Sequence, residues 1–423
     1  MIELFRKSPK RLAVQLTLAC WLVGSSAAMA VEAASPGNLE SLPGANVEGL
    51  LVLVKNYNPN LAAAALDAEE AAAKVYPAGA LDDPTVNLSR DEGFRQTMLS
   101  VSQEFPLWGK RELRRGIAEA NARGARDRQG NVQKELEEQV KVAFAQYYAA
   151  DKALTVTHDI HTLLDNLSET VRARYAQGLA NQSDAIRADL ERTRINSELF
   201  MLERDREAAK AKINALIGRQ IEAPLAQPAL LRSVPDANSL VFASLMMRAR
   251  EQNPMFAMAQ ADIAAAEGDL RLTQKSWYPD ITVSVGADDL PGLAPRPTIG
   301  VGIKIPIQGE LRRANEHAAS AKASAARSRL SGTTLQVESE LKTALVTLTQ
   351  TQQNKGLLDN ALRQQAEAAY QSALASYQNS RGDLTAVIEA AHQQIEINLQ
   401  LLRAQSEEQT ALAAIERLAG GEL

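Results

Sequence analysis

Several features that identify common protein classes are missing from this sequence of 423 residues. A single cysteine excludes a disulfide scaffold and a cysteine-rich zinc site. No stretch after the N-terminal segment has about 18 consecutive apolar residues, so we expect no transmembrane helix in the mature chain. A net charge of −5 with no basic stripe argues against nucleic acid as the main partner, and 45% hydrophobic residues are too many for a disordered chain.

Catalytic motifs are missing as well. The sequence has no G-x-S-x-G, no Walker loop and no H-E-x-x-H, and its four histidines supply little acid–base chemistry. His158, His161 and Asp165 would share one helix face and could ligate zinc or copper, but we favour the interpretation of a polar helix surface. We therefore predict that the protein is not an enzyme and holds no cofactor and no resident metal.

The first thirty residues are organised like a secretory signal peptide. Four basic side chains lie within the first eleven residues, residues 12–24 are apolar, and Ala28-Met29-Ala30 matches a small-residue cleavage signal. Removal of residues 1–30 would leave an exported chain without cysteine. Two alternatives stay open: a short membrane anchor, or lipidation of Cys20, although Thr17 stands where a lipidation signal has an aliphatic residue.

The rest of the chain contains the same order of motifs twice. Each copy has an Asn-Pro opening, an alanine-rich segment, two strand-like runs, a glycine turn, a long helical pattern and a tyrosine-led break. Pro59 and Pro254 are 195 positions apart, and Tyr175 and Tyr377 are 202 apart. We therefore expect a first repeat (31–218), a proline-containing linker (219–235) and a second repeat (236–423).

The helical patterns are long. Residues 111–176 contain no proline and would span about 100 Å at ~1.5 Å per residue. The return helices, 183–217 and 383–418, are about half as long, and the helices 59–75 and 254–276 could stack on their ends to make up the difference. This pattern predicts the wall of a tube. A long structural coiled coil is the alternative, and the strand-like runs argue against it.

Those runs alternate apolar with small or polar residues. Ile299, Val301 and Ile303 alternate with glycine and lysine, and residues 281–285, 85–89 and 99–105 follow the same period of two, although Gln103 interrupts the apolar face. Four strands cannot close a barrel alone, and open edges are not tolerated in lipid, so several copies would each supply four strands. Half of a soluble sandwich is the alternative.

Taken together, these motifs resemble the TolC family of outer-membrane efflux proteins. The resemblance covers nearly the whole mature chain and includes Phe105-Pro-Leu-Trp-Gly-Lys110, Tyr175-Ala-Gln-Gly178 and the Leu-Ile-Gly ending at 216–218. It implies a mainly α fold with a membrane β-barrel: a homotrimer with a long antiparallel α-helical barrel and four β-strands per protomer, closed as a twelve-stranded barrel in the outer membrane.

The resemblance also implies a function. Family members are exit ducts of tripartite pumps and dock a periplasmic adaptor and an inner-membrane transporter of the RND type. Short hairpin loops at 91–93 and 288–297 and the Tyr278-Pro-Asp-Ile281 run look most like the heavy-metal branch of the family, of the cobalt–zinc–cadmium or copper type. The alternatives are a multidrug duct of the same family and a periplasmic coiled-coil adaptor or structural protein.

The family narrows its tunnel at the periplasmic tip with acids nine and twelve residues after each tyrosine. Here Tyr175 is followed by Asp184 and Arg187, and Tyr377 by Ala386 and Glu389. The resemblance therefore implies rings of Asp184 and Glu389, which would favour cations. The alternative for Asp184 is an ordinary acidic residue at a helix N-terminus.

Two further sets of residues have expected roles. The turns that contain Tyr175, Gly178, Tyr377 and Gly382 are the expected docking surface for the adaptor. Trp108, with Lys110 and Arg111, is expected to anchor the chain at the membrane–water boundary, where aromatic and basic side chains are favoured.

Overall fold

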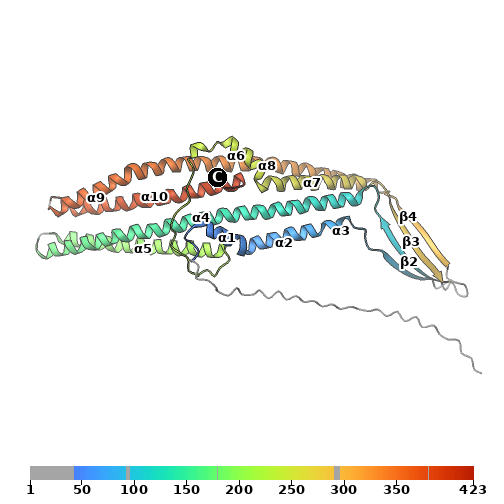
Figure 1. Ribbon diagram of the computed structural model, residues 1–423, viewed down its shortest axis with the longest axis horizontal. Helices are drawn as coiled ribbons and strands as arrows, with labels where there is room; N and C mark the ends of the chain where they lie inside the picture. The colour runs from blue at the N-terminus through green and yellow to red at the C-terminus, as the bar shows by residue number, and fades with distance from the viewer. Residues whose placement is uncertain (1–41, 92–95, 179, 290–295, 380) are drawn as a thin grey trace, which may run out of the picture. The chain divides into compact units, whose positions relative to one another are not determined.

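Helices make up most of the chain, and each half of it contains elements in the same order. The computed structural model describes residues 42–91, 96–178, 180–289, 296–379 and 381–423. The predicted signal peptide with Cys20, and the central residues of both strand-connecting loops, lie outside the described residues. Residues Leu42–Leu423 form one unit, in which the helices run side by side with the sheet at one end and the helical turns at the other (Figure 1).

The first half contains α1 (Val47–Tyr57), α2 (Pro59–Ala73), α3 (Val75–Gly79), β1 (Thr85–Asp91), β2 (Gln96–Phe105), α4 (Lys110–Ala176) and α5 (Gln182–Leu216). The second half contains η1 (Ala237–Ser239), α6 (Phe242–Gln252), α7 (Pro254–Lys275), β3 (Asp280–Asp289), β4 (Arg296–Lys304), α8 (Gly309–Leu357), the π-helical turn η2 (Leu358–Leu362), α9 (Arg363–Gln378) and α10 (Leu384–Ala419). Among the described residues, no helix combines the length and apolar character needed to cross a membrane.

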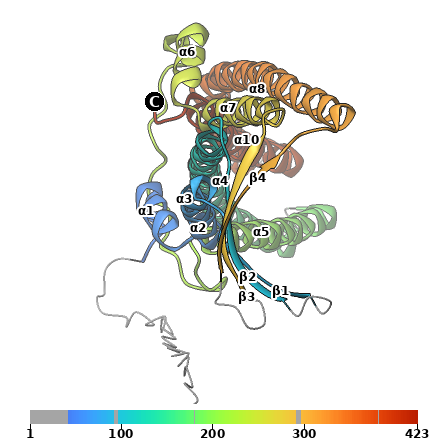
Figure 2. The same cartoon turned by 90° about the vertical axis from the view of Figure 1, so that its right-hand side faces the viewer.

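The helices are arranged in an arc. α4 packs against α5, α10, α7 and α2, and α8 packs against α7 and α10. Viewed from the sheet end, α5 and α8 lie at the two ends of the arc, and α1 and α6 lie on its convex side (Figure 2). Two apolar clusters hold α1 and α6 there: one joins α1 to α4 and α5, and the other joins α6 to α8 and α10.

The predicted end-to-end stacking of short helices on the return helices is present. Gly218 and Gly420 end these helices with φ of 69° and 86°, in the left-handed region that glycine tolerates best. A Cβ on Gly218 would lie 2.5 Å from the carbonyl oxygen of Tyr57, so the ends of α5 and α1 meet at van der Waals distance. Asn58, at the start of α2, donates to Leu216 O of α5, and Asn253, at the start of α7, donates to Leu418 O of α10. Each stack is therefore a second, interrupted rod, one beside α4 and the other beside α8 and α9.

The four strands form one antiparallel sheet in the order β1-β2-β3-β4. The sequence predicted two hairpins; pairing of β2 with β3, with Val101 opposite Val285, joins them into one sheet. Because opposed residues share a face, Val86, Val101, Val285 and Ile299 lie together on one side. Serine, threonine and glycine predominate on the other side, with Asn87, Met98 and Glu104 among them.

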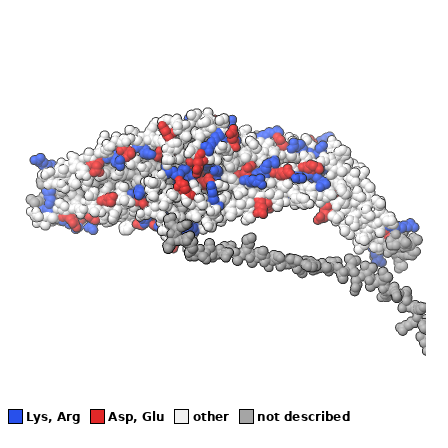
Figure 3. Space-filling view, viewed as in Figure 1, with Lys and Arg blue, Asp and Glu red and all other residues white. Residues whose placement is uncertain are grey.

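The apolar face of the sheet is uncovered. Leu88, Ile299 and Val301 are 73%, 79% and 67% exposed. The face of the sheet in the space-filling view carries few charged side chains, whereas the helices beside it carry both signs interspersed (Figure 3). The outer edges, β1 and β4, have no strand partner among the described residues.

Candidate functional site

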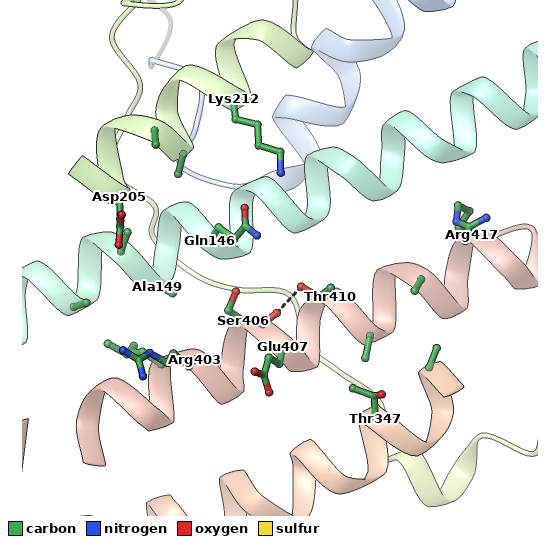
Figure 4. A pocket seen from close by; sticks show the side chains of 18 of the residues that line it. Gln146, Ala149, Asp205, Lys212, Thr347, Arg403, Ser406, Glu407, Thr410 and Arg417 are labelled. Carbon is green, nitrogen blue, oxygen red and sulfur yellow. Dashed lines mark hydrogen bonds between the residues drawn. The ribbon is translucent and has the colours of Figure 1, made fainter. Parts of the chain in front are cut away.

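The concave face of the arc holds a groove of about 1030 Å³. Its walls come from α4, α5, α8 and α10, and the labelled side chains of Gln146, Lys212 and Arg403 lie around the gap between these helices (Figure 4). Much of its floor is alanine, including Ala149, Ala153 and Ala411. Small side chains on facing helices leave the space that larger residues would fill.

Apart from Asp205, which pairs with Arg204, the charges that line this groove fall into two groups. The Arg417 guanidinium is held by the carboxylates of Glu138 at 2.7 Å and Glu340 at 3.1 Å. Lys212, Arg403 and Glu407 make no ion pair with another described residue. These three side chains are exposed on the groove, so it presents water-facing charges of both signs over an apolar floor.

A buried ion-pair cluster supports the wall from behind. Lys141 of α4 and Glu416 of α10 are each at most 5% exposed at the side chain, and their charged atoms are 2.8 Å apart. Arg232, in the linker between the repeats, contacts the same Glu416 carboxylate at 3.0 Å. The cluster joins α4, α10 and the linker, and sequence reasoning missed it because its members are 91 to 275 positions apart along the chain.

At the opposite end from the sheet, Tyr377 and Tyr175 differ in environment. Tyr377 is 7% exposed within a cluster of residues from α4, α5, α9 and α10, whereas Tyr175 is 46% exposed. Arg174 lies over the Tyr377 ring at 5.0 Å and donates to its backbone oxygen at 3.1 Å. Burial raises the pKa of the Tyr377 phenol, and the nearby Arg174 charge opposes that rise.

The two acids predicted for a tip constriction lie at the starts of α5 and α10. Asp184 is half-buried, and one oxygen of its carboxylate accepts the Asn181 N–H at 3.4 Å, as an acid in a first helical turn does. Glu389 is exposed and makes no ion pair with another described residue. Whether either narrows a tunnel depends on other copies of the chain, so the constriction stays a prediction.

Arg187 occupies a position where the family pattern has an acid, and it joins the two repeats. Its guanidinium donates to the Thr385 hydroxyl at 2.5 Å. A hydrogen bond from Thr385, with a contribution from Arg187, lowers the pKa of Asp383. Sequence reasoning treated Arg187 only as a departure from the pattern. It did not single out Arg174, although a basic residue beside the tyrosine at the turn of one repeat was an available signal.

The turns predicted to dock an adaptor are open. A Cβ on Gly178, whose φ is 73°, would meet nothing within 4 Å, so backbone geometry accounts for this glycine. Gly382 is exposed, and its N–H donates to Ser376 O at 3.1 Å. The docking role stays a prediction.

The residues predicted as a membrane anchor form an internal joint. Lys110 is 6% exposed, and its Nζ lies 2.7 Å from Asp280 and 2.9 Å from Tyr278 O. Trp108 has a φ of 64°, donates through Nε1 to Pro279 O at 2.9 Å and is half exposed. Arg111 donates to Gly79 O at 2.8 and 3.0 Å. Of the three, Trp108 retains the most free surface for contact with lipid.

In the set His158, His161 and Asp165, the last two residues already contact charged or polar side chains. His161 Nδ1 lies 3.3 Å from Asp165, whose other oxygen lies 2.9 Å from Arg192. Within the described ranges, no group of three or more potential ligands is placed to hold a metal ion. A guanidinium at the carboxylate competes with any cation there.

Comparison with known proteins gives the family. The model of the outer membrane efflux protein family matches residues 50–219 and 245–421. No curated protein sequence matches the chain. Among solved structures, the outer-membrane channel OprN is similar with 18% identity, 89% of this chain and 90% of that chain covered, and a TM-score of 0.78.

Two further structures are similar at the level of the fold. VceC from Vibrio cholerae is 18% identical, with 89% of this chain and 96% of that chain covered and a TM-score of 0.77. CusC is 16% identical, with 89% and 92% covered and a TM-score of 0.75. The chain belongs to the outer membrane efflux protein family, whose members are transport channels of the outer membrane and not enzymes.

Proposed function

We propose that this chain is the outer-membrane exit duct of a tripartite RND-type efflux system and works as a homotrimer. The observation that carries the proposal is the open arc: one protomer presents a concave wall and free edges on both its helices and its sheet. Copies of an arc with two different free edges join head to tail, and they form a ring when the rotation between neighbours closes. Pairing of β4 with the next copy's β1 would remove the open sheet edges.

The sheet supplies the membrane-embedded part in this proposal. Its strands are 7 to 10 residues long, close to the ~9–11 residues that a tilted strand needs to span a bilayer. The uncovered apolar side chains, such as Ile299, would face lipid, and the serine and glycine face would line the lumen. Residues 1–30 would serve as the signal peptide, and the helices would extend into the periplasm.

The tip supplies the docking and gating part. The turns around Tyr175, Gly178, Tyr377 and Gly382 are the proposed adaptor-docking surface. The exposure of Tyr175, Gly178 and Gly382 supports this role, whereas Tyr377 is buried and would shape the turn from inside. In a threefold ring, Asp184 and Glu389 would form two acidic rings near the axis. Like charges in a constriction raise the local concentration of cations.

The proposed cargo is a heavy-metal cation. Support comes from the Tyr278-Pro-Asp-Ile281 run, the short strand-connecting loops and the acidic tip residues. Organic compounds are the second candidate, favoured by one observation: the alanine floor of the groove is apolar and would suit a lipophilic cargo better than a hydrated ion.

Channel recordings test the proposal. Purified protein in planar bilayers should conduct as a trimer and prefer cations, as read from the reversal potential in a salt gradient. Asp184→Asn with Glu389→Gln should lower that preference, whereas Glu48→Gln, on the convex-side helix α1, should leave it unchanged. Equal selectivity in all three proteins would reject the acidic rings.

Growth tests decide between the cargoes. A deletion strain should become sensitive to one or more of zinc, cadmium, cobalt, nickel, copper and silver, and the wild-type gene should restore growth. Sensitivity to lipophilic drugs alone would retain the duct and reject the metal cargo. Resistance of the protein to carbonate extraction from the outer-membrane fraction is expected in either case.

A further inference from the structure

The two outer edges of the helical arc carry side chains of complementary size. We propose that neighbouring copies join through a seam in which large side chains of α5 from one copy pack against small side chains of α9 from the next. The π-helical turn η2 would provide the socket for the largest of these side chains. This inference rests on the proposed ring of copies and specifies which surfaces meet.

The α5 edge is apolar and uncovered. α5 packs mainly against α4, which leaves its opposite face free. Ile186, Leu190 and Phe200 are 60%, 67% and 77% exposed on that face. Thr193 and Ser197 continue the same stripe, so the spacing is four, three, four and three, which is the period of a coiled-coil seam. Large apolar side chains in this pattern suit packing against a second helix.

The α9 edge has the opposite character. Ala366, Tyr370 and Tyr377 are buried, the tyrosines within the tip cluster. The exposed face carries Ala368, Ser372 and Ala375 at spacings of four and three. Small residues let a second helix approach closely and leave holes for large knobs.

The two edges match in height along the helices. Glu191 of α5 pairs with His392 of α10, and Gln394 of α10 donates to Glu367 of α9. His392 and Gln394 are two residues apart on α10, so Glu191 and Glu367 lie at nearly the same height. Their sequence neighbours Leu190 and Ala368 are therefore level as well. A rotation about an axis parallel to the helices preserves height, so equal levels on opposite edges are the condition for a ring to close.

At the π-helical turn the α8–α9 edge changes from small to large residues. Arg363 N donates to Leu358 O, five residues back, which brings positions five apart onto a common face. Leu358 is 2% exposed and packs against Ile397 and Leu401, whereas Leu357 and Leu362 are 64% and 42% exposed on the free edge.

Phe200 lies at the height of this turn on the other edge. Leu202, two residues after Phe200, lines the concave groove together with Leu399 and Leu402 of α10. Between those two lies Leu401, which packs against Leu358 of the π-helical turn, so Phe200 and the turn are level. The α4 helix of the first repeat has no such turn and is α-helical throughout. The wider turn therefore belongs only to the edge that faces Phe200, and we infer that the Phe200 ring packs between the two exposed leucines.

Paired cysteines test the seam in the full-length protein. Leu190→Cys combined with Ala368→Cys should give a covalent trimer on oxidation, seen on a non-reducing gel. Leu190→Cys combined with Val52→Cys is the matched control and should not, since Val52 is an exposed residue of α1, and α1 lies on the convex side of the arc (Figure 2). Trimers in native mass spectrometry without the first cross-link would overturn the seam but retain the duct. Monomers of wild-type protein would reject both.

A truncation tests the socket without cysteine chemistry. Phe200→Ala should raise the concentration at which trimers dissociate about 30-fold, the effect of losing one interface hot spot. Leu230→Ala, which removes another exposed apolar side chain from the linker, should have no such effect. Equal dissociation of the two variants would contradict the role of Phe200, and unchanged circular dichroism would show that both are folded.

Discussion

The amide of Asn58 connects the end of one helix to the start of another 158 positions away. Its Nδ2 donates to Leu216 O at 2.7 Å, and its Oδ1 accepts the Asn60 and Leu61 N–H groups at 2.9 and 3.1 Å. Asn253 makes the equivalent contacts with Leu418 O and Met255 N, both at 2.9 Å. One side chain in each repeat therefore caps the short helix and holds it on the return helix.

Substitution of this asparagine separates its two roles. Asn58→Ala should lower the free energy of unfolding by about 2 kcal/mol, because a helix cap and a buried hydrogen bond to Leu216 are both lost. Asn58→Asp keeps the cap but turns a carboxylate oxygen toward the Leu216 carbonyl, so it should remain destabilising. Denaturation in detergent, followed by circular dichroism, measures both. The neighbouring exposed Asn60→Ala serves as control, and equal stability of all variants would reject the clamp.

Two glycines with similar backbone angles should respond differently to alanine. Gly178 and Gly420 have φ of 73° and 86°. A Cβ on Gly178 meets nothing, so Gly178→Ala should cost only the ~1–2 kcal/mol of a left-handed alanine. A Cβ on Gly420 would lie 2.6 Å from the Gln252 carbonyl carbon, so Gly420→Ala should cost clearly more and separate α10 from α6. Hydrogen exchange at residues 250–253 reports that separation; equal protection would contradict it.

The Lys110–Asp280 pair joins the helix after β2 to the strand of the other repeat. The charged atoms are 2.7 Å apart, and the two side chains are 8% and 16% exposed. Asp280→Ala should destabilise by about 3–5 kcal/mol, because it leaves a buried ammonium without its partner. The double variant Lys110→Met/Asp280→Leu should recover most of that loss. A double-mutant cycle measured by thermal unfolding checks this, and additive losses would reject the coupling.

The sequence predicted the helices, the alternating strands and the stacked pairs because each follows from local periodicity. Lys110 shows the limit of such reasoning. Its place after Trp108 and Gly109 suggested a basic residue at a membrane surface, but its partner Asp280 lies in the other repeat, 170 positions away. Pairing between repeats is set by the packing of the arc, which no local pattern encodes. The same reason hid the contact of Arg187 with Thr385, which also joins the two repeats.

Acid should loosen the start of α5. A hydrogen bond from Arg172 lowers the pKa of Asp189, and Ser168 adds a second. Because the folded pKa is below the ordinary value of ~3.9, the stabilisation is complete above that value and is lost as the pH falls through the folded pKa. Hydrogen exchange of α5 should therefore increase in that range, after correction for intrinsic rates. Asp189→Asn should show no such step; a step of equal size would assign it to other groups.

The arginines of the tip should hold the two helical pairs of one protomer together. Arg174 and Arg187 belong to the first repeat, and their contacts, Tyr377 and Thr385, belong to the second. In a closed ring these contacts draw α9 and α10 toward α4 and α5, so their loss should widen the tip. We expect Arg174→Ala/Arg187→Ala to raise single-channel conductance several-fold in planar bilayers.

The matched control is Arg192→Ala. Arg192 is also an arginine of α5, but its partner Asp165, at 2.9 Å, lies on α4 of the same repeat. Its loss removes a positive charge and the contact with Asp165 without releasing one repeat from the other. Conductance that rises equally in both variants would attribute the effect to lost positive charge, and conductance that rises in neither would mean that other contacts set the width of the tip.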